Sequence, residues 1–301
     1  MTTAPSPPMP VATDSSAAFT RSDWALFAAI AGIWGASFLL IAIGLESLQP
    51  GVVTLLRVGL GAASLWLLPG DRARIAPEDR GRLVAVSFLW VAIPFTLFPL
   101  AEQHINSAVT GLLNGATPMF TALFAALFFS RRTTGPQLLG VFVGFAGIVL
   151  ISAPSLGEGS SEAVGVVLAL LATLCYGIAT NLVVPLQLRY GSRVVMGRML
   201  ALATLWTLPY GLFGISDSVV ELGPLVAVSV LGLVGTGLAF VLMGTLVGRV
   251  GATRATFITY LVPVVALVLG VLFQDDHVAV PALVGVVLVL TGAVLASRRE
   301  A

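Results

Sequence analysis

The chain is divided by long apolar runs, each about as long as a lipid bilayer is thick. The run AVGVVLALLATL at residues 163–174 is typical, since it has no polar face at helical spacing. A helix that is apolar on every side faces lipid or other apolar helices, and about 20 residues cross the hydrocarbon core. The runs therefore predict an all-α integral membrane protein whose main partner is the lipid bilayer.

The number of runs and their spacing predict ten transmembrane helices. Hydrophobic residues make up 57% of the 301 residues and charged residues 10%, whereas about 25% are charged in soluble domains. We expect the helices at residues 24–45, 51–68, 82–102, 107–129, 136–153, 163–186, 194–213, 224–247, 252–273 and 278–296.

The arginines test this number of helices independently, because cytoplasmic loops of membrane proteins are enriched in basic residues. With ten spans and a cytoplasmic N-terminus, every loop and bordering helix turn that holds arginine lies on the inner side. These arginines are Arg21, Arg72, Arg74, Arg80, Arg82, Arg131, Arg132, Arg189, Arg193, Arg198, Arg249, Arg254, Arg298 and Arg299. One helix more or fewer would destroy this alternation, so the sequence predicts that both termini are cytoplasmic, in a cell (inner) membrane.

The two ends of the chain differ in composition from the apolar runs. Residues 1–20 are rich in Ala, Pro, Ser and Thr and carry no basic residue ahead of an apolar core, so the tail at residues 1–23 does not resemble a signal peptide. We expect a disordered cytoplasmic tail there and a second short tail at residues 298–301. The formal net charge is +1, and the arginines form no basic stripe, so we expect no nucleic-acid partner.

The second half of the chain repeats part of the first at an offset of 145 residues. Without a gap, this offset aligns Pro118 with Pro263, Phe128 with Phe273, Pro136 with Pro281, Gly140 with Gly285, Gly147 with Gly292 and Ser152 with Ser297. At a slightly different offset, WGAS at residues 34–37 resembles YGIA at 176–179. An odd number of helices in each half makes the second copy cross the membrane in the opposite sense. We therefore expect two inverted five-helix repeats, at residues 24–153 and 163–297.

Several segments, taken in order, resemble the drug/metabolite transporter superfamily, and within it the EamA-like family of ten-helix transporters. They are IWGASFL at residues 33–39, PGVVTLLR at 50–57, SAVTGLLNGATPMFTALFAALFF at 107–129 and LLGVFVGFAGIVLIS at 138–152. The resemblance spans residues 24–297 and implies transport, usually export, of amino acids, metabolites or drugs. Family members often carry Glu at the end of the fourth and ninth helices, where this chain has Arg131 and Asp276.

Arg57 is the first candidate for binding a solute, because it lies about six residues inside a predicted helix. A charge placed deep in a helix costs about 2.5–3.5 kcal/mol on insertion scales. Its guanidinium is suited to bind a solute carboxylate in bidentate fashion. The alternative, which we favour because the resemblance places an Arg here in transporters of different solutes, is structural: Arg57 extends towards the interface or binds helix carbonyls.

The remaining candidates are polar or aromatic residues in predicted spans. Asn114 and Thr117 precede Pro118, and their repeat partners Thr259 and Val262 precede Pro263, with Tyr260 next to Thr259. A proline frees a carbonyl and kinks a helix, so we expect these residues either to bind solute or to bond between helices. Trp34 and Tyr176 are equivalent in the repeat. We expect them either to line the solute-binding site or to pack against other helices. Glu46 and Glu102, at outer helix ends, are the candidates for ion coupling.

What the predicted spans lack narrows the function. No Asp or Glu lies in the central part of any predicted span, and both histidines lie in predicted outer loops. This disfavours permanently cationic solutes, intramembrane catalysis and haem binding. No catalytic residue, metal site or cofactor is expected, and Cys175 is a small core residue.

The sequence therefore predicts a transporter of small neutral or zwitterionic solutes such as amino acids, working by alternating access. The family resemblance implies export, and the sequence itself leaves the direction of transport open. A carrier of drug-like or nucleobase-like solutes is the alternative within this class. A channel or an intramembrane enzyme is the alternative of another class. The sequence leaves monomer and homodimer open.

Overall fold

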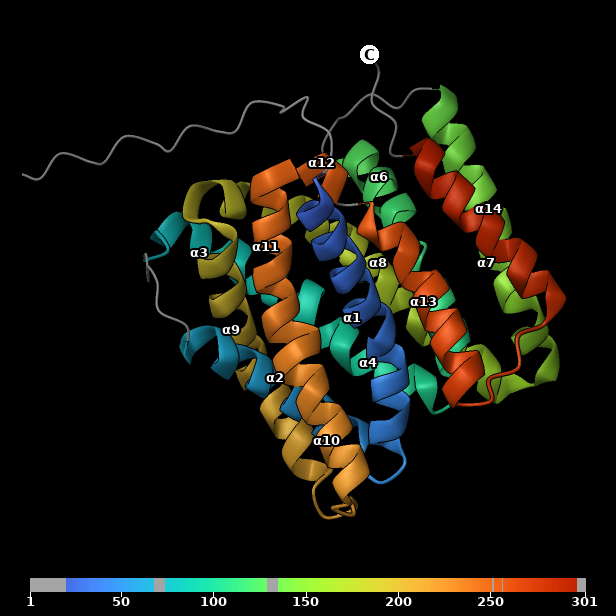
Figure 1. Ribbon diagram of the computed structural model, residues 1–301, viewed down its shortest axis with the longest axis horizontal. Coiled ribbons are helices and arrows are strands. Elements are labelled where there is room, and N and C mark those ends of the chain that lie inside the picture. Colours follow the sequence, from blue (N-terminus) through green and yellow to red (C-terminus); the bar gives the residue numbers. More distant parts are fainter. Residues whose placement is uncertain (1–19, 68–73, 129–134, 251, 256, 297–301) are drawn as a thin grey trace, which may run out of the picture.

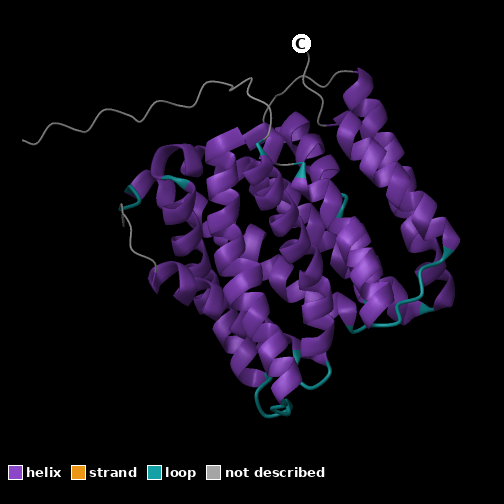
Figure 2. Ribbon diagram, viewed as in Figure 1, coloured by secondary structure: helices purple, strands orange, loops and turns teal. Residues whose placement is uncertain are grey.

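A computed structural model describes residues 20–67, 74–128, 135–250, 252–255 and 257–296. The tail at residues 1–19 and Arg72, Arg131, Arg132, Ser297, Arg298 and Arg299 lie outside the described residues. The part of the chain that is described folds into helices and contains no strand (Figure 2). The predicted all-α class is thus confirmed.

The helices follow one another with short connections. Their bounds are α1 Arg21–Leu45, α2 Pro50–Leu67, α3 Pro77–Val86, η1 Ser87–Ala92, α4 Ile93–Glu102, α5 Ser107–Asn114, α6 Thr117–Phe128, α7 Gly135–Glu158, α8 Ser160–Tyr190, α9 Ser192–Phe213, α10 Leu222–Val230, η2 Leu231–Leu238, α11 Ala239–Val250, α12 Ala252–Ala255, α13 Ile258–Phe273 and α14 Val280–Ala296 (Figure 1). The segments η1 and η2 are π-helical, and each continues directly into the α-helices on either side of it.

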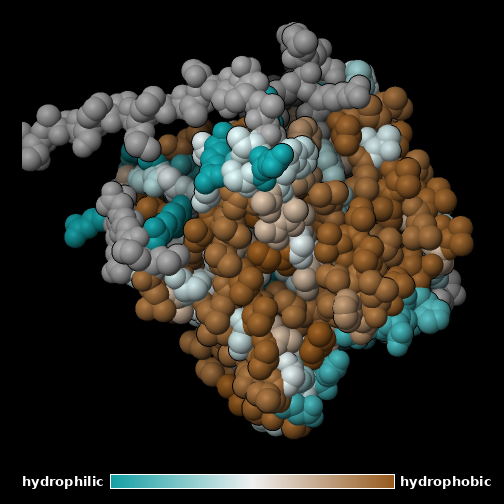
Figure 3. All heavy atoms as spheres, in the orientation of Figure 1, coloured by the Kyte–Doolittle hydropathy of each residue, from teal (hydrophilic) through white to brown (hydrophobic). Residues whose placement is uncertain are grey.

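Seven helical segments among the described residues are long and apolar enough to cross a membrane. They are Arg21–Leu45, Pro50–Leu67, Pro77–Glu102, Ser107–Phe128, Gly135–Pro154, Ser160–Tyr190 and Leu222–Val250. The apolar helices Ile258–Phe273 and Val280–Leu295 are shorter. Figure 3 shows hydrophobic residues over most of the visible face, with hydrophilic residues gathered towards its top and lower edge. The chain is a multi-pass integral membrane protein.

Local sequence explains where two of these helices begin. At the start of α1, the Thr20 hydroxyl accepts from the Asp23 amide at 3.2 Å, and the Asp23 carboxylate accepts from the Thr20 amide at 3.0 Å. At the start of α5, Asn106 Oδ1 accepts from the Val109 amide at 2.8 Å. Such caps satisfy amide groups that have no partner inside the helix.

Two predicted helices are interrupted. The span expected at 107–129 breaks at Gly115–Ala116, so Pro118 is the second residue of α6 and not a kink inside one helix. Proline is tolerated at such a position because the first amides of a helix have no intrahelical partner. The span expected at 252–273 begins with the short helix α12, and Pro263 lies inside α13. Pro118 therefore lies at the start of a helix, whereas Pro263 lies inside one.

The break in the first of these helices meets the proline in the second. A Cβ atom at Gly115 would lie 2.6 Å from Cγ of Pro263, so only glycine allows this approach. One turn earlier, Gly111 packs directly against Ala266. The small residues therefore let α5 and α13 lie in close contact.

Helices α7 and α14 form a pair at one side of the molecule (Figure 1). A Cβ atom at Gly285 would lie 2.6 Å from the carbonyl oxygen of Gly147, and one at Gly292 would lie 2.5 Å from that of Gly140. Four glycines thus hold the two backbones at a distance that any larger side chain would increase. Close packing of this kind stabilises helix pairs in lipid, where the hydrophobic effect between helices is absent.

We expect Gly285→Ala to destabilise the protein, because its methyl group would collide with the α7 backbone. Overpacking costs about 1–3 kcal/mol, so the unfolding temperature in nanodiscs should fall by several degrees. Gly197→Ala in α9 is the matched control, since a Cβ atom there has nothing within 4 Å. Equal unfolding temperatures for the two variants would contradict the α7–α14 contact.

Candidate functional site

Arg57 lies in the interior of the molecule and does not reach an interface. It is a residue of α2 and is 6% exposed. Its guanidinium carbon lies 3.7 Å from the centre of the Phe95 ring, and Nε donates to Thr236 Oγ1 at 3.4 Å. Among the described residues it forms no ion pair with a carboxylate. The structure therefore shows neither the extension to the interface nor the carbonyl bonds considered from the sequence.

Close backbone contact brings Thr236 within reach of Arg57. A Cβ atom at Gly61 would lie 2.7 Å from Thr236 Cγ2, and one at Gly232 would lie 3.0 Å from the Arg57 carbonyl oxygen. Thr236 itself is buried in η2 and donates to the Leu231 carbonyl at 3.2 Å. The glycines thus let α2 lie against η2, so that residues far apart in sequence share one polar contact.

Phe95 is held in place by a second contact with α2. Thr54 Oγ1 donates to the Phe95 carbonyl at 2.9 Å and to the Pro50 carbonyl at the same distance. A cation over an aromatic face is worth about 0.5 kcal/mol when exposed and 2 or more when desolvated. The Phe95 ring therefore compensates part of the cost of burying the Arg57 charge.

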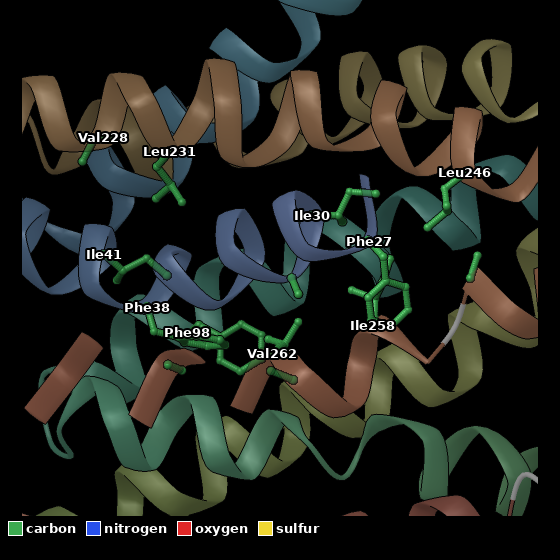
Figure 4. Close-up of a cluster of buried hydrophobic side chains, with 14 of the residues drawn as sticks. Phe27, Ile30, Phe38, Ile41, Phe98, Val228, Leu231, Leu246, Ile258 and Val262 are labelled. Carbon is green, nitrogen blue, oxygen red and sulfur yellow. The ribbon is translucent and has the colours of Figure 1, made fainter. Parts of the chain in front are cut away.

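Aromatic rings surround this position on several helices. Trp34 meets Phe240 edge-on at 6.3 Å between ring centres, and Tyr176 meets Phe98 at 5.8 Å. Phe98 also meets Phe38 at 5.5 Å, and Figure 4 shows these two rings beside Val262. We call Trp34, Phe38, Phe95, Phe98, Tyr176 and Phe240 the central aromatic cluster. Its residues come from α1, α4, α8 and α11. Trp34 and Tyr176 pack against the same buried cluster, and Arg57 contacts Phe95.

The residues around the two prolines divide between two places. Thr117 Oγ1 donates to the Asn114 carbonyl at 2.8 Å and also reaches Asn114 Oδ1 at 3.3 Å, across the break between α5 and α6. Tyr260 instead donates its hydroxyl to the Ala293 carbonyl of α14 at 3.1 Å, while Thr259 is half-buried beside it in α13. Asn114 and Thr117 thus stabilise a helix break, and Tyr260 bonds between helices.

The two candidate carboxylates have different surroundings. Glu46 is exposed at the end of α1. Glu102, the last residue of α4, has both carboxylate oxygens buried, and neither has a hydrogen-bond partner among the described residues. It interacts electrostatically with Arg57 and Asp276 without forming an ion pair with Arg57. Glu102, and not Glu46, is therefore close to the central region.

Sequence reasoning missed Phe95, Phe98 and Thr236. Phe95 and Phe98 precede Glu102 by seven and four residues, so the three lie on one face of the helix. That spacing indicates that the two rings lie on the same face as Glu102, although apolar residues at helical spacing are common in any packed helix. Thr236 lies between Gly235 and Gly237, and nothing in the local sequence pairs it with Arg57.

Comparison with known proteins identifies the family. The model of the EamA-like transporter family matches residues 23–153 and again residues 163–298. The chain belongs to the EamA-like transporter family. It is therefore a membrane transporter and not an enzyme.

Named relatives of this EamA-like protein cover almost the whole chain. A probable terminal-alkyne amino-acid exporter of Streptantibioticus cattleyicolor is 27% identical, over 93% of this chain and 94% of that one. A probable amino-acid metabolite efflux pump of Escherichia coli K12 is 24% identical, over 91% and 94%. A solved crystal structure, 21% identical, superposes with a TM-score of 0.64 over 91% of this chain and 96% of that one, which supports the fold.

We expect Phe95→Leu to lower the free energy of unfolding by about 1–3 kcal/mol, because it removes the ring beneath Arg57 and leaves a small cavity. Thermal unfolding in nanodiscs measures the change. Phe142→Leu is the matched control, since Phe142 is 71% exposed on α7. If the two variants are equally stable, the Arg57–Phe95 contact contributes nothing to the stability of the protein.

Proposed function

We propose that this EamA-like protein exports small neutral or zwitterionic organic solutes, amino acids or related metabolites, by alternating access. The observation that carries the proposal is the environment of Arg57. A buried guanidinium that is stacked on a ring, but not paired with an acid among the described residues, leaves donors for a solute carboxylate. The central aromatic cluster supplies apolar walls for the rest of the solute.

Ten spans in two inverted five-helix repeats are part of the same proposal. Helices α3, α5 and α7 begin at Pro77, Ser107 and Gly135, and α10, α12 and α14 each begin 145 residues later. Both copies also hold a π-helical segment at the corresponding place, η1 and η2. Helix α1 packs against α13, and α8 packs against α6 in the corresponding way. These correspondences and the two matches of the family model support the repeat.

Contacts between the two halves close both ends of the molecule. At the end that we assign to the outside, His104 Nδ1 lies 2.8 Å from Ser161 Oγ, and Ser107 Oγ donates to Asp276 at 2.7 Å. At the end that we assign to the cytoplasm, Arg249 donates to Ser22 Oγ at 3.3 Å and lies 3.6 Å from Asp23.

His104 and Arg249 are 145 residues apart, so the two ends use corresponding positions of the repeat. In an alternating-access cycle, one set of these contacts breaks while the other holds. The two sets therefore support opening towards either side of the membrane. With the arginine-rich ends inside, both termini are cytoplasmic in the cell membrane.

The contact between α3 and α8 adds an ion-pair cluster at the inner end. Arg189 of α8 binds Asp79 at 2.7 Å and Glu78 at 3.0 Å, and the Tyr190 hydroxyl donates to Asp79 at 2.7 Å. Arg189 and Glu78 are more than half exposed, whereas the Asp79 side chain is 14% exposed. Exposed ion pairs are worth about 0–1 kcal/mol each, so the Arg189–Glu78 pair is weak enough to break and reform during transport.

The test is flux of labelled amino acids into liposomes that contain the purified protein. We expect saturable flux of one class of amino acid, and faster exchange when unlabelled solute is present on the opposite side. Empty liposomes are the control, and an imposed pH gradient shows whether protons are coupled. Flux no greater than in empty liposomes would contradict the proposed class and favour drug-like or nucleobase-like solutes.

A further inference from the structure

Glu102 presents a charge that the protein does not satisfy. Both of its carboxylate oxygens are buried, and neither accepts a hydrogen bond from a described residue. Leaving a buried carboxylate without a partner is among the costliest arrangements in a protein. The neighbouring acid Asp276 is different, because Ser107 Oγ and the Ala108 amide donate to its Oδ2 at 2.7 and 2.9 Å. Glu102 therefore lacks a partner, which either a proton or a cation from outside the chain would supply, whereas Asp276 already has two donors.

Arg57 presents the opposite charge on the same side of α4. Its guanidinium lies over Phe95, which is seven residues before Glu102. Seven residues of α-helix rise about 10 Å, so the two charges lie roughly two helical turns apart along α4. They interact electrostatically, yet they form no ion pair. Each of the two side chains can therefore bind a solute.

The separation corresponds to the size of an α-amino acid. A hydrogen bond of about 2.8 Å at each end and about 3 Å between the ammonium nitrogen and a carboxylate oxygen add to roughly 9 Å. Phe98 lies one turn before Glu102 on the same face of the helix, and its ring contacts Tyr176 and Phe38. Aromatic faces beside the two charges offer an apolar surface for a side chain.

We propose that Arg57 and Glu102 form a two-pole site, in which Glu102 binds the ammonium group and Arg57 binds the carboxylate of a zwitterionic solute. This inference rests on the proposed function and names the residue that determines specificity within it. The second acid, Asp276, adds negative potential beside the ammonium group. Solutes with one charge leave one pole without a partner, so the site selects against them.

The test uses three probes that share the isobutyl side chain of leucine: leucine itself, 4-methylpentanoate without the ammonium group, and 3-methylbutylamine without the carboxylate. Competition against labelled leucine counterflow in liposomes measures their apparent affinities. For the unaltered protein, we expect leucine to compete at least tenfold better than either analogue. Equal competition by 4-methylpentanoate would overturn the two-pole site while leaving the transport function intact, and this arm needs no variant.

Glu102→Gln tests the pole directly. We expect this change to weaken the apparent affinity for leucine at least tenfold and to leave the apparent affinity for 4-methylpentanoate unchanged. The control is Glu221→Gln, which replaces an exposed acid before α10 and should alter neither affinity. If Glu102→Gln abolishes only the response to a pH gradient and keeps the preference for leucine, Glu102 holds a proton and the inference is wrong. If the protein transports none of the three probes, the proposed function fails together with this inference.

Discussion

The burial of the Arg57 charge is the constraint on which the central part of this structure depends. Lipid offers no hydrogen bonds, so a charge inside the fold must find its partners in the protein. Here they are the face of Phe95 and the hydroxyl of Thr236. The contact with Thr236 requires the glycines at positions 61 and 232, which let α2 lie against η2, and Phe95 is held by the hydrogen bond from Thr54 to its carbonyl. A few small or polar residues thus fix the position of the buried guanidinium.

Small residues and weak polar contacts also explain how the helices are held together and how they can move. The pair α7–α14 meets where backbones touch directly, and in the pair α5–α13 glycines of α5 meet the side chains of Pro263 and Ala266. The contacts at the two ends are hydrogen bonds and ion pairs with at least one exposed or half-exposed partner, and exposed ion pairs cost little to break. Packing is therefore strongest within the membrane and weakest at the ends. A carrier needs this combination, because its halves must stay associated while their ends open in turn.

Much of this fold could be predicted from the sequence, because apolar runs and the positions of arginine follow directly from the physics of a bilayer. The predicted helix ends lie within a few residues of those in the structure, and the interruption at Gly115–Ala116 was not predicted, because Asn114, Thr117 and Pro118 indicate a kink in one helix. That Trp34, Arg57 and Tyr176 bind a solute stays a prediction. The partners of Arg57 could not be predicted, since Thr236 is 179 residues away in the sequence. A contact of that range is set by packing.

In the proposed transport cycle, the two halves open the two ends of the molecule in alternation. Spin labels in the protein lacking Cys175, at Gln103 and Asp217 for the outer end and at Arg80 and Gly248 for the inner end, would measure both distances in nanodiscs by pulsed electron resonance. With leucine added, the account predicts that one distance distribution lengthens while the other shortens. Distances that stay fixed, or that lengthen at both ends together as in a channel, would contradict it.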